Sequence, residues 1–575
     1  MDKKRILNMC RGLEKATLVF KHAKIINVYS KEIEEKDLAV HDGIILGIGD
    51  YQGIEEVDLS GYYIAPGFID GHVHIESSML TPGGFARIVV PKGTTTVIAD
   101  PHEIANVSGI KGIEFMLESS EHIPLNVYMM IPSCVPATKD ENSGAIITAQ
   151  DIKKLKKHPR VIGLGEVMDY PSVIQGDRMI HEKIDVMKTS NIDGHAPDLC
   201  GFDLNAYAYA GIQTDHECTY PQPMIERIRR GMYVHLREGS ATRNTRPLLQ
   251  GLKKKYLNRT LFCTDDKHPE DIRLEGHINY NVNLAIEEGI DPIDAISMAT
   301  INAATCYHLK DVGGLAPGKM ADFIVFNDFK HIDPAYVYKR GQLVAKDGVP
   351  LFEHKQMIPR DVLNTVQFND DFISFDLPLD QEYAHVIGLI KNNIITHHLI
   401  EKVDHQDHHF NYHPEQNIMK LAVIERHHKR NSMAVGLVKG FGFKDGAIAM
   451  TIAHDSHNIV IAGTSDEAMR CATQKIKELQ GGIVIVEHDR VVDYLQLEIS
   501  GIMTNQLEHH VEQSLSRMKQ KMNEMGYQKD MGDPFIALAF LALPVIPKLK
   551  LTDRGLFDVE SFRIIPIAYD KKAQS

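Results

Sequence analysis

The stretch Pro66-Gly-Phe-Ile-Asp-Gly-His-Val-His74 places two histidines two positions apart at the end of a short apolar run. An apolar run of this length, bounded by glycine, is typical of a buried β-strand. Residues i and i+2 of a strand point to the same side, so both imidazoles can reach one ion. The motif therefore predicts a strand that ends in a pair of metal ligands.

The same pattern recurs along the chain after this strand. Further apolar runs end in polar residues, and helix-like segments separate most of them, which predicts eight strands alternating with helices. This alternation is typical of an α/β fold of the (β/α)8, TIM-like barrel type. The runs after the first are residues 95–100, 126–131, 161–166, 192–195, 211–216, 232–237 and 261–265.

Histidines and carboxylates collect at the ends of six of these eight predicted strands. The carboxyl ends of barrel strands meet on one face, which is where such barrels carry their chemistry. Imidazole nitrogens and carboxylate oxygens together suit one or two divalent ions. The candidates are His72, His74, Asp100, His102, Glu103, Glu166, His195, Asp215, His216, Glu217, Asp265 and Asp266.

The regions that flank the barrel have a different pattern. Residues 1–64 form short β-rich runs punctuated by glycine, and the chain turns back into strand after Gly313. We therefore expect residues 1–64 and 310–365 to form a composite β-sandwich domain. Residues 65–309 would form the metal-binding barrel, and residues 366–575 a C-terminal α/β domain.

The composition restricts the partners. The chain has 575 residues, a formal net charge of −14 and 30 histidines without any tryptophan. An acidic chain is a poor partner for nucleic acid or an anionic membrane, so we expect a small substrate. No apolar segment follows the N-terminal residues and no apolar run is long enough to span a bilayer, which predicts a cytoplasmic protein.

Several longer strings resemble those of bacterial-type adenine deaminases, within the amidohydrolase superfamily. The resemblance extends from about Ala65 to Val325 and again through the C-terminal region. The strings around Glu76, His102, Asp265 and His454 are more specific than the opening histidine pair. The matching strings are residues 66–78, Asp100-Pro-His-Glu-Ile-Ala-Asn106, Asp193-Gly-His-Ala-Pro197, Thr214-Asp-His-Glu217, Arg237-Glu-Gly-Ser240, Phe262-Cys-Thr-Asp-Asp-Lys-His-Pro269 and Ala453-His-Asp-Ser-His-Asn458.

The resemblance implies a binuclear metal site. One ion would be held by His72, His74 and Asp265, and the other by Glu166, His195 and His216. Many superfamily members bridge the ions with a carboxylated lysine on the fourth strand, where this chain has Glu166. The resemblance also implies Mn²⁺ or Fe²⁺, with Zn²⁺ compatible with the same ligands, and a homo-oligomer, a dimer or higher.

The implied reaction is the hydrolysis of adenine to hypoxanthine and ammonia by a metal-activated hydroxide. Asp265 or Asp266 would take the proton of the water and pass it to the departing amine, with Glu166 as the third catalytic carboxylate. Zinc nucleobase deaminases need an H-x-E together with a P-C-x-x-C motif, and no P-C-x-x-C occurs here. Adenine deamination by this chain would therefore use a scaffold unrelated to that of the zinc nucleobase deaminases.

A second group of residues is expected to support the ligands or contact the substrate. For Glu76 and Ser77 a simple loop role is an equal alternative, and Arg237 with Glu238 suggests a structural ion pair at the end of one strand. The pairs His427-His428 and His509-His510 are expected on the surface. The whole group is Glu76, Ser77, Asp100, His102, Glu103, Arg237, Glu238, His454, Asp455 and His457.

Two other functions have to be weighed. A metal hydroxide also attacks carbonyls, so the alternative is an amidohydrolase acting on another aminopurine or a cyclic amide. Glu166 and the string Asp100-Pro-His-Glu103 count against the cyclic amide. A non-catalytic relative would be expected to lose ligands, and every proposed ligand is present.

Overall fold

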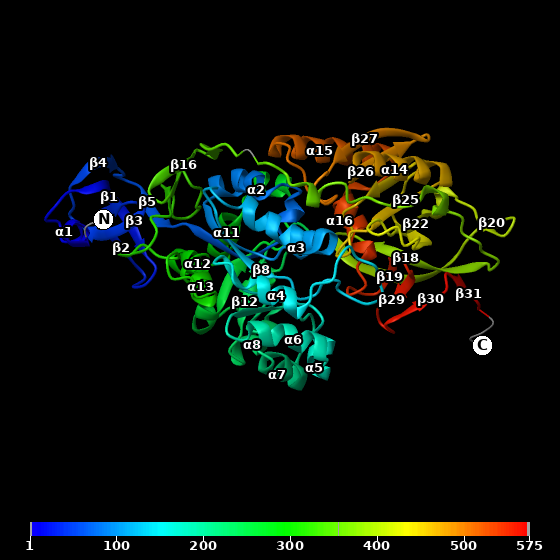
Figure 1. The fold of residues 1–575 in the computed structure, drawn as a ribbon, viewed down its shortest axis with the longest axis horizontal. Helices are drawn as coiled ribbons and strands as arrows, with labels where there is room; N and C mark the ends of the chain where they lie inside the picture. Colours follow the sequence, from blue (N-terminus) through cyan, green and yellow to red (C-terminus); the bar gives the residue numbers. More distant parts are fainter. Residues whose placement is uncertain (1–2, 355, 572–575) are drawn as a thin grey trace.

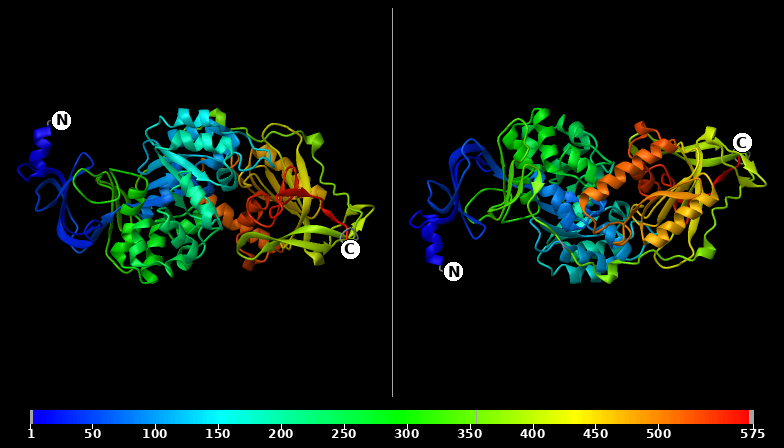
Figure 2. Two further views of the ribbon diagram at one scale, coloured as in Figure 1. Left: turned by 90° about the horizontal axis from the view of Figure 1, so that it is seen from below. Right: turned by 90° about the horizontal axis from the view of Figure 1, so that it is seen from above.

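The computed structural model describes residues 3–354 and 356–571. The molecule is elongated, with an N-terminal sheet at one end, the barrel in the middle and the C-terminal region at the other end (Figure 1). Two further views agree that the N- and C-termini lie at opposite ends (Figure 2).

A ring of parallel strands forms the centre of the molecule. A five-stranded and a three-stranded sheet together supply eight strands. Beside β13 and β6, the Asp265 N–H donates to the His72 carbonyl at 3.0 Å and the His74 N–H to the Asp265 carbonyl at 3.1 Å. The Gln213 N–H donates to the Ile192 carbonyl at 3.0 Å between β10 and β11. The predicted barrel is confirmed, with strands β6 (Phe68–Val73), β7 (Thr94–Ala99), β8 (Asn126–Ile131), β9 (Val161–Val167), β10 (Asn191–Gly194), β11 (Thr214–Asp215), β12 (Tyr233–Arg237) and β13 (Thr260–Cys263).

Helices surround this ring, and several begin at a side-chain cap. Thr148 and Asp151 form a reciprocal capping box at α4, and the Asp177 carboxylate accepts from the first turn of α6. The helices are α2 (Pro82–Val89), α3 (His102–Ser119), α4 (Ala149–Leu155), α5 (Tyr170–Gln175), α6 (Arg178–Met187), α7 (Gly201–Tyr209), α8 (Pro221–Arg229), α9 (Thr245–Leu249), α10 (Pro269–Leu274), α11 (Ile278–Glu287), α12 (Pro292–Met298) and α13 (Ile301–Cys306).

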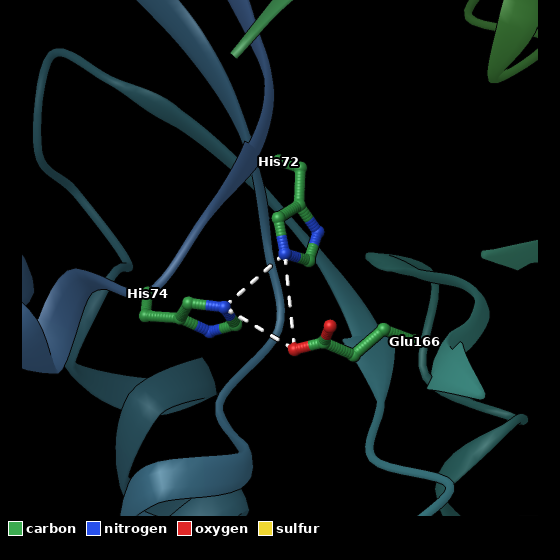
Figure 3. A group of neighbouring side chains, drawn as sticks. All are labelled: His72, His74 and Glu166. Carbon is green, nitrogen blue, oxygen red and sulfur yellow. Dashed lines mark hydrogen bonds and ion pairs between the residues drawn. The ribbon is translucent and has the colours of Figure 1, made fainter. Parts of the chain in front are cut away.

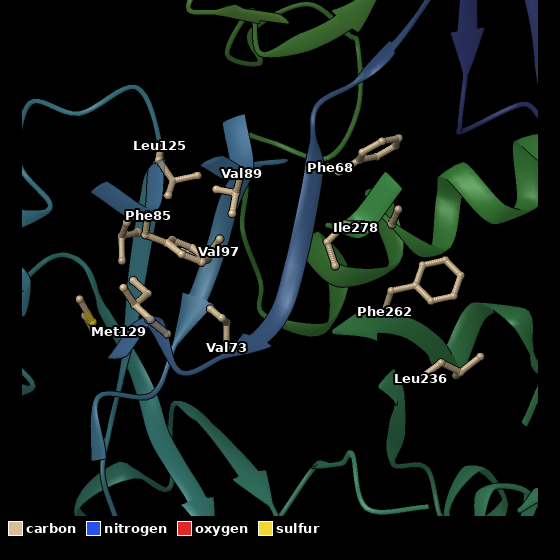
Figure 4. Close-up of a cluster of buried hydrophobic side chains, with 14 of the residues drawn as sticks. Phe68, Val73, Phe85, Val89, Val97, Leu125, Met129, Leu236, Phe262 and Ile278 are labelled. Atoms are coloured by element: carbon tan, nitrogen blue, oxygen red, sulfur yellow. The ribbon is translucent and has the colours of Figure 1, made fainter. Parts of the chain in front are cut away.

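Apolar side chains from the strands and helices form one continuous core around the barrel. Phe68 and Val97 project from β6 and β7, and Phe85 and Met129 reach the same cluster from α2 and β8 (Figure 4). All four are fully or almost fully buried. This packing holds the strand ends, and therefore the polar residues that follow them, at fixed positions.

Replacement of Phe85 by alanine is expected to lower the free energy of unfolding by about 3–5 kcal/mol, because it leaves a cavity in this core. The urea midpoint, followed by circular dichroism, measures the effect. The matched control is Phe202→Ala on α7, whose side chain is 88% exposed and whose loss should shift stability by less than about 0.5 kcal/mol. Equal midpoints for the two variants would contradict the assignment of Phe85 to the core.

The N-terminal strands share one sheet with strands from beyond the barrel. In this nine-stranded sheet β14 pairs antiparallel with β5, with Ile324 opposite Ala65. This pairing supports a composite β domain, and its limits at residues 64, 310 and 365 stay a prediction. The elements are α1 (Lys3–Cys10), β1 (Ala16–Asn27), β2 (Glu32–His41), β3 (Ile44–Gly49), β4 (Gly53–Asp58), β5 (Tyr63–Pro66), β14 (Phe323–Phe326), β15 (Tyr336–Lys339), β16 (Gln342–Lys346) and β17 (Val349–Pro350).

A second nine-stranded sheet and three main helices form the C-terminal region. Helix α14 packs on β24, β25 and β26 of this sheet, and α16 lies beside the barrel (Figure 1). The elements are β18 (Tyr383–Ile390), β19 (Asn393–Lys402), β20 (His405–Gln406), β21 (His409–Phe410), β22 (Ile418–Ile424), β23 (Met433–Lys439), β24 (Ala447–Met450), β25 (Ile459–Gly463), α14 (Asp466–Leu479), β26 (Gly482–Glu487), β27 (Arg490–Gln496), α15 (Glu508–Met525), α16 (Pro534–Ala539), β28 (Leu549–Thr552), β29 (Gly555–Asp558), β30 (Arg563–Ile565) and β31 (Ala568–Tyr569).

One predicted surface pair is wrong in part. His428, His509 and His510 are exposed, but His427 is buried and its Nε2 lies 2.8 Å from the Ser456 carbonyl. The reason is tertiary, because the loop that carries Ser456 folds over the end of β22. Within residues 3–354 and 356–571, no helix combines the length and the apolar character needed to cross a membrane.

Candidate metal centre

Glu166, at the end of β9, lies between two sets of histidines. Its Oε1 is 3.3 Å from His74 Nε2 and 3.9 Å from His72 Nε2 (Figure 3). Its Oε2 is 2.7 Å from His195 Nδ1 and 3.3 Å from His216 Nε2. A carboxylate with one oxygen directed to each histidine set has the geometry of a bridging ligand.

The two histidines of β6 present ring nitrogens to the same point. His72 Nε2 and His74 Nε2 are 3.1 Å apart, and both side chains are buried. His74 Nδ1 lies 2.9 Å from the Asp100 carbonyl, which can only accept, so Nδ1 carries the proton. The neutral tautomer leaves a lone pair on Nε2, which is the form that binds a metal ion.

Asp265 completes this side of the cluster. Its backbone adopts a left-handed conformation, with φ 61°, directly after β13. Its Oδ1 is 3.0 Å from His74 Nε2 and 3.5 Å from His72 Nε2, and its Oδ2 accepts from Arg237 Nη1 at 2.8 Å. Burial opposes ionisation, but the charge of Arg237 and the hydrogen bonds from the histidines hold the pKa of Asp265 well below its usual value.

Arg237 pairs with Asp265 and Glu217, and the suggested ion pair with Glu238 is wrong. Arg237 Nη2 donates to Glu217 Oε2 at 3.0 Å, whereas Glu238 Oε2 accepts from the Thr245 N–H at 3.3 Å. Successive side chains of a strand point to opposite sides, so Arg237 enters the site and Glu238 leaves it. Burial alone would raise the pKa of Glu217, but the charges of Arg237 and His195 lower it to about 2.

Asp100 and His102 lie behind the cluster and support it. Asp100 Oδ2 accepts from the Glu166 N–H at 2.9 Å, and His102 Nδ1 is 3.4 Å from Glu166 Oε1. Three atoms around Glu166 are buried without a hydrogen-bond partner in the described part of the chain, namely His72 Nδ1, Asp100 Oδ1 and His102 Nδ1. Unpartnered buried polar atoms, together with a nitrogen and oxygen ligand set, fit the binding of divalent cations.

Glu76, Ser77 and Asp266 form the side of the site next to the histidine pair. The Ser77 hydroxyl donates to Asp266 Oδ1, and Glu76 Oε1 accepts from the Ile104 N–H at 3.2 Å. Burial and the neighbouring charge of Asp265 raise the pKa of Asp266. Ser77 therefore contacts a candidate site residue and Glu76 contacts the backbone of α3, and a contact of either side chain with the substrate stays a prediction.

The C-terminal histidine motif reaches the same place across more than 350 residues of chain. Glu103 Oε1 lies 2.7 Å from His454 Nδ1, and Glu103 Oε2 contacts His457 Nε2. Asp455 Oδ1 lies 3.8 Å from His102 Nε2. All of these side chains are buried, so the loop at residues 453–458 closes one side of the barrel mouth.

A cavity of about 650 Å³ opens over the cluster. The barrel supplies one wall and the C-terminal region supplies the other, through α16 and residues 392–395 and 543–547. Among the predicted residues that do not line the cavity, His72 and Asp100 lie beneath its lining and Glu238 lies outside it. The predicted residues that line the cavity are His74, His102, Glu103, Glu166, His195, His216, Arg237, Asp265, Asp266, His454 and Asp455.

His235 and Tyr307 lie next to the cluster and were not among the predicted site residues. His235 is buried in β12 with its ring centroid 6.5 Å from that of His72, and its Nε2 is 3.5 Å from the Tyr307 hydroxyl. That hydroxyl donates to Asp193 Oδ2 at 2.9 Å. The sequence did contain a signal for His235. This residue precedes Arg237 by two positions, so both side chains lie on the same side of the strand.

Known proteins match the chain over almost its whole length. A family model described as the amidohydrolase family matches residues 63–344, and one described as the adenine deaminase C-terminal domain matches residues 393–563. The chain is 45% identical over 566 residues to adenine deaminase 2 of Carboxydothermus hydrogenoformans, covering 98% of this chain and 99% of that one. It is 46% identical over 562 residues to adenine deaminase of Listeria welshimeri, with 96% and 97% covered. A solved β-aspartyl dipeptidase of Fervidobacterium islandicum AW-1 matches with a TM-score of 0.46 and 19% identity, over 59% of this chain and 100% of that one.

Proposed function

The chain belongs to the adenine deaminase family of amidohydrolases, and we propose that it hydrolyses adenine to hypoxanthine and ammonia. The observation that carries the proposal is the position of Glu166, with one carboxylate oxygen directed to each of two histidine sets. A cavity bounded by acidic and imidazole side chains lies directly over this carboxylate.

Two divalent ions would be held by six side chains that the structure brings together. Glu166 would bridge them, because each of its oxygens already faces a different set. Ions bound there supply a water molecule of lowered pKa and polarise the group under attack. The ligands are His72, His74, Glu166, His195, His216 and Asp265, and the ions are Mn²⁺ or Fe²⁺, with Zn²⁺ also compatible with this donor set.

Asp265 acts as the proton carrier of the reaction. As the oxygen of water bonds to C6 of adenine, the Asp265 carboxylate takes the proton of the water and then delivers it to the amino nitrogen. The C6–N bond breaks, ammonia leaves, and the oxygen stays on the ring as that of hypoxanthine. Arg237 fixes the carboxylate through Oδ2, which leaves Oδ1 on the side of the histidines.

Asp266 faces the same cavity and orients the amino group. The Ser77 hydroxyl holds Asp266 Oδ1, so the carboxylate has a single orientation toward the cavity. Ile536 on α16 and Phe540 in the turn after it cover the cavity from the other side and exclude bulk water.

A substrate panel tests this function. Protein loaded with Mn²⁺ is incubated with adenine, other aminopurines and cyclic amides, and ammonia and the organic product are quantified. We expect equal amounts of ammonia and hypoxanthine from adenine. Hydrolysis of a cyclic amide with adenine left intact would overturn the proposed substrate.

The family resemblance also supports a homo-oligomer, a dimer or higher. Light scattering of the purified protein gives the subunit count directly. The cytoplasmic location expected from the sequence stays a prediction.

A further inference from the structure

A narrower, mostly apolar pocket opens beside the cavity over the metal ligands. The two share Glu103, Asp266, His454 and Phe540 in their walls. The apolar wall comes almost entirely from the C-terminal region, whereas the polar lining residues are Glu76, Ser77, Glu103, Asp266, His268, His454 and His457. The apolar side chains are Met79, Met450, Ile452, Ile502, Phe535, Ile536, Ala539 and Phe540. At about 30 Å³ this pocket is too small for a purine, so the base would lie in the adjoining cavity of about 650 Å³, with one edge at the side chains that the two share.

His454 is the polar group that the C-terminal region brings to this edge. The ring of Phe540 stacks on its imidazole, with centroids 4.4 Å apart and an interplanar angle of 28°. Nδ1 is bonded to Glu103 at 2.7 Å, and Nε2 has no hydrogen-bond partner among the described residues. The ring is therefore fixed on one face and at one nitrogen, and its other nitrogen is left for a ligand.

Glu103 is itself held by a second histidine. The Ala453 N–H donates to His457 Nδ1 at 3.3 Å, so His457 carries its proton on Nε2 and donates it to Glu103. The second oxygen of Glu103 then accepts from His454 Nδ1. This network joins α3 of the barrel to the C-terminal loop and determines the orientation of the His454 ring.

The charges around His454 favour a proton on both ring nitrogens. Burial opposes the charged form, but Glu103, Asp266 and Asp455 together raise the pKa of His454 to about 9. The neighbouring imidazole of His457, with its ring centroid 5.7 Å away, shares the Glu103 carboxylate with His454. Nε2 is therefore a hydrogen-bond donor toward the pocket at neutral pH.

We propose that His454 binds the purine ring, by donating a hydrogen bond from Nε2 to a ring nitrogen of adenine. This assignment rests on the proposed function. A donor at a ring nitrogen withdraws electron density from the ring and makes C6 easier for water to attack. Glu103 and His457 are positioning residues, since they act through the orientation and protonation of His454.

The variant His454→Phe tests the assignment, because phenylalanine keeps a ring against Phe540 and removes the donor. Calorimetry measures the Kd of 1-deaza-, 3-deaza- and 7-deazaadenine for the Mn²⁺-loaded parent and variant. In the parent, the analogue that lacks the bonded nitrogen should bind about 10- to 100-fold more weakly than the other two. In His454→Phe this difference should disappear, and kcat/KM for adenine should fall by a similar factor.

The controls separate binding from folding. His510→Phe, an exposed histidine on α15, should leave Kd and kcat/KM unchanged, and the metal content of all proteins should be equal. Glu103→Gln should weaken the discrimination without abolishing it. Identical discrimination in parent and His454→Phe, or none in the parent, would overturn the assignment whether or not adenine is deaminated. Discrimination by the parent without turnover of adenine would instead overturn the proposed reaction and leave His454 as a purine-binding residue.

Discussion

The variant Asp265→Asn is expected to release ammonia from adenine about 10²–10⁴-fold more slowly than the parent, the usual contribution of a general acid–base group. Asparagine keeps the size of the side chain but cannot take a proton from water. It also presents an amide where Arg237 now meets a carboxylate oxygen. The measurement is kcat at saturating adenine for protein loaded with Mn²⁺.

Metal content has to be measured in the same samples, because Asp265 is also a proposed ligand. Asp203→Asn, on the exposed face of α7, is the matched control and should have the activity of the parent. An Asp265→Asn variant with the parent's kcat and the parent's metal content would contradict both roles of this residue.

The variant Glu166→Gln is expected to retain at most one ion per chain and to lose about a thousandfold in activity. Glutamine can offer one oxygen, but its amide nitrogen cannot replace the oxygen that now faces His195 and His216. Loss of a metal that supplies several kcal/mol of transition-state stabilisation corresponds to a factor of this size. Elemental analysis and initial rates measure the two effects.

A matched control for Glu166 is Glu478→Gln, since the Glu478 side chain is 68% exposed at the end of α14. This control should keep two ions and full activity. If Glu166→Gln behaved in the same way, the carboxylate would not be the bridge between two ions.

The ligands could be predicted because each follows a strand of the barrel. In such a fold the position along the sequence also gives the position in space: a residue at the carboxyl end of a strand lies at the mouth. Glu166, His195 and His216 belong to different strands and still meet, as this rule predicts. The alternation of side chains along β6 likewise predicted that His72 and His74 point the same way.

Partners across the fold could not be predicted, because local sequence does not encode them. Arg237 has a carboxylate next to it in sequence, yet its partners come from the ends of β11 and β13. His427 was expected at the surface, and a loop that follows β24 buries it. Nothing within the string His454 to His457 indicates that Glu103 lies opposite, since that contact joins residues more than 350 positions apart in the sequence.

The most direct test of the account is a titration of metal-free protein with Mn²⁺, with ammonia release from adenine as the signal. We expect no activity without metal, and activity that rises until two equivalents per chain are bound. Full activity in the metal-free protein, or no ammonia from adenine at any Mn²⁺ concentration, would contradict it.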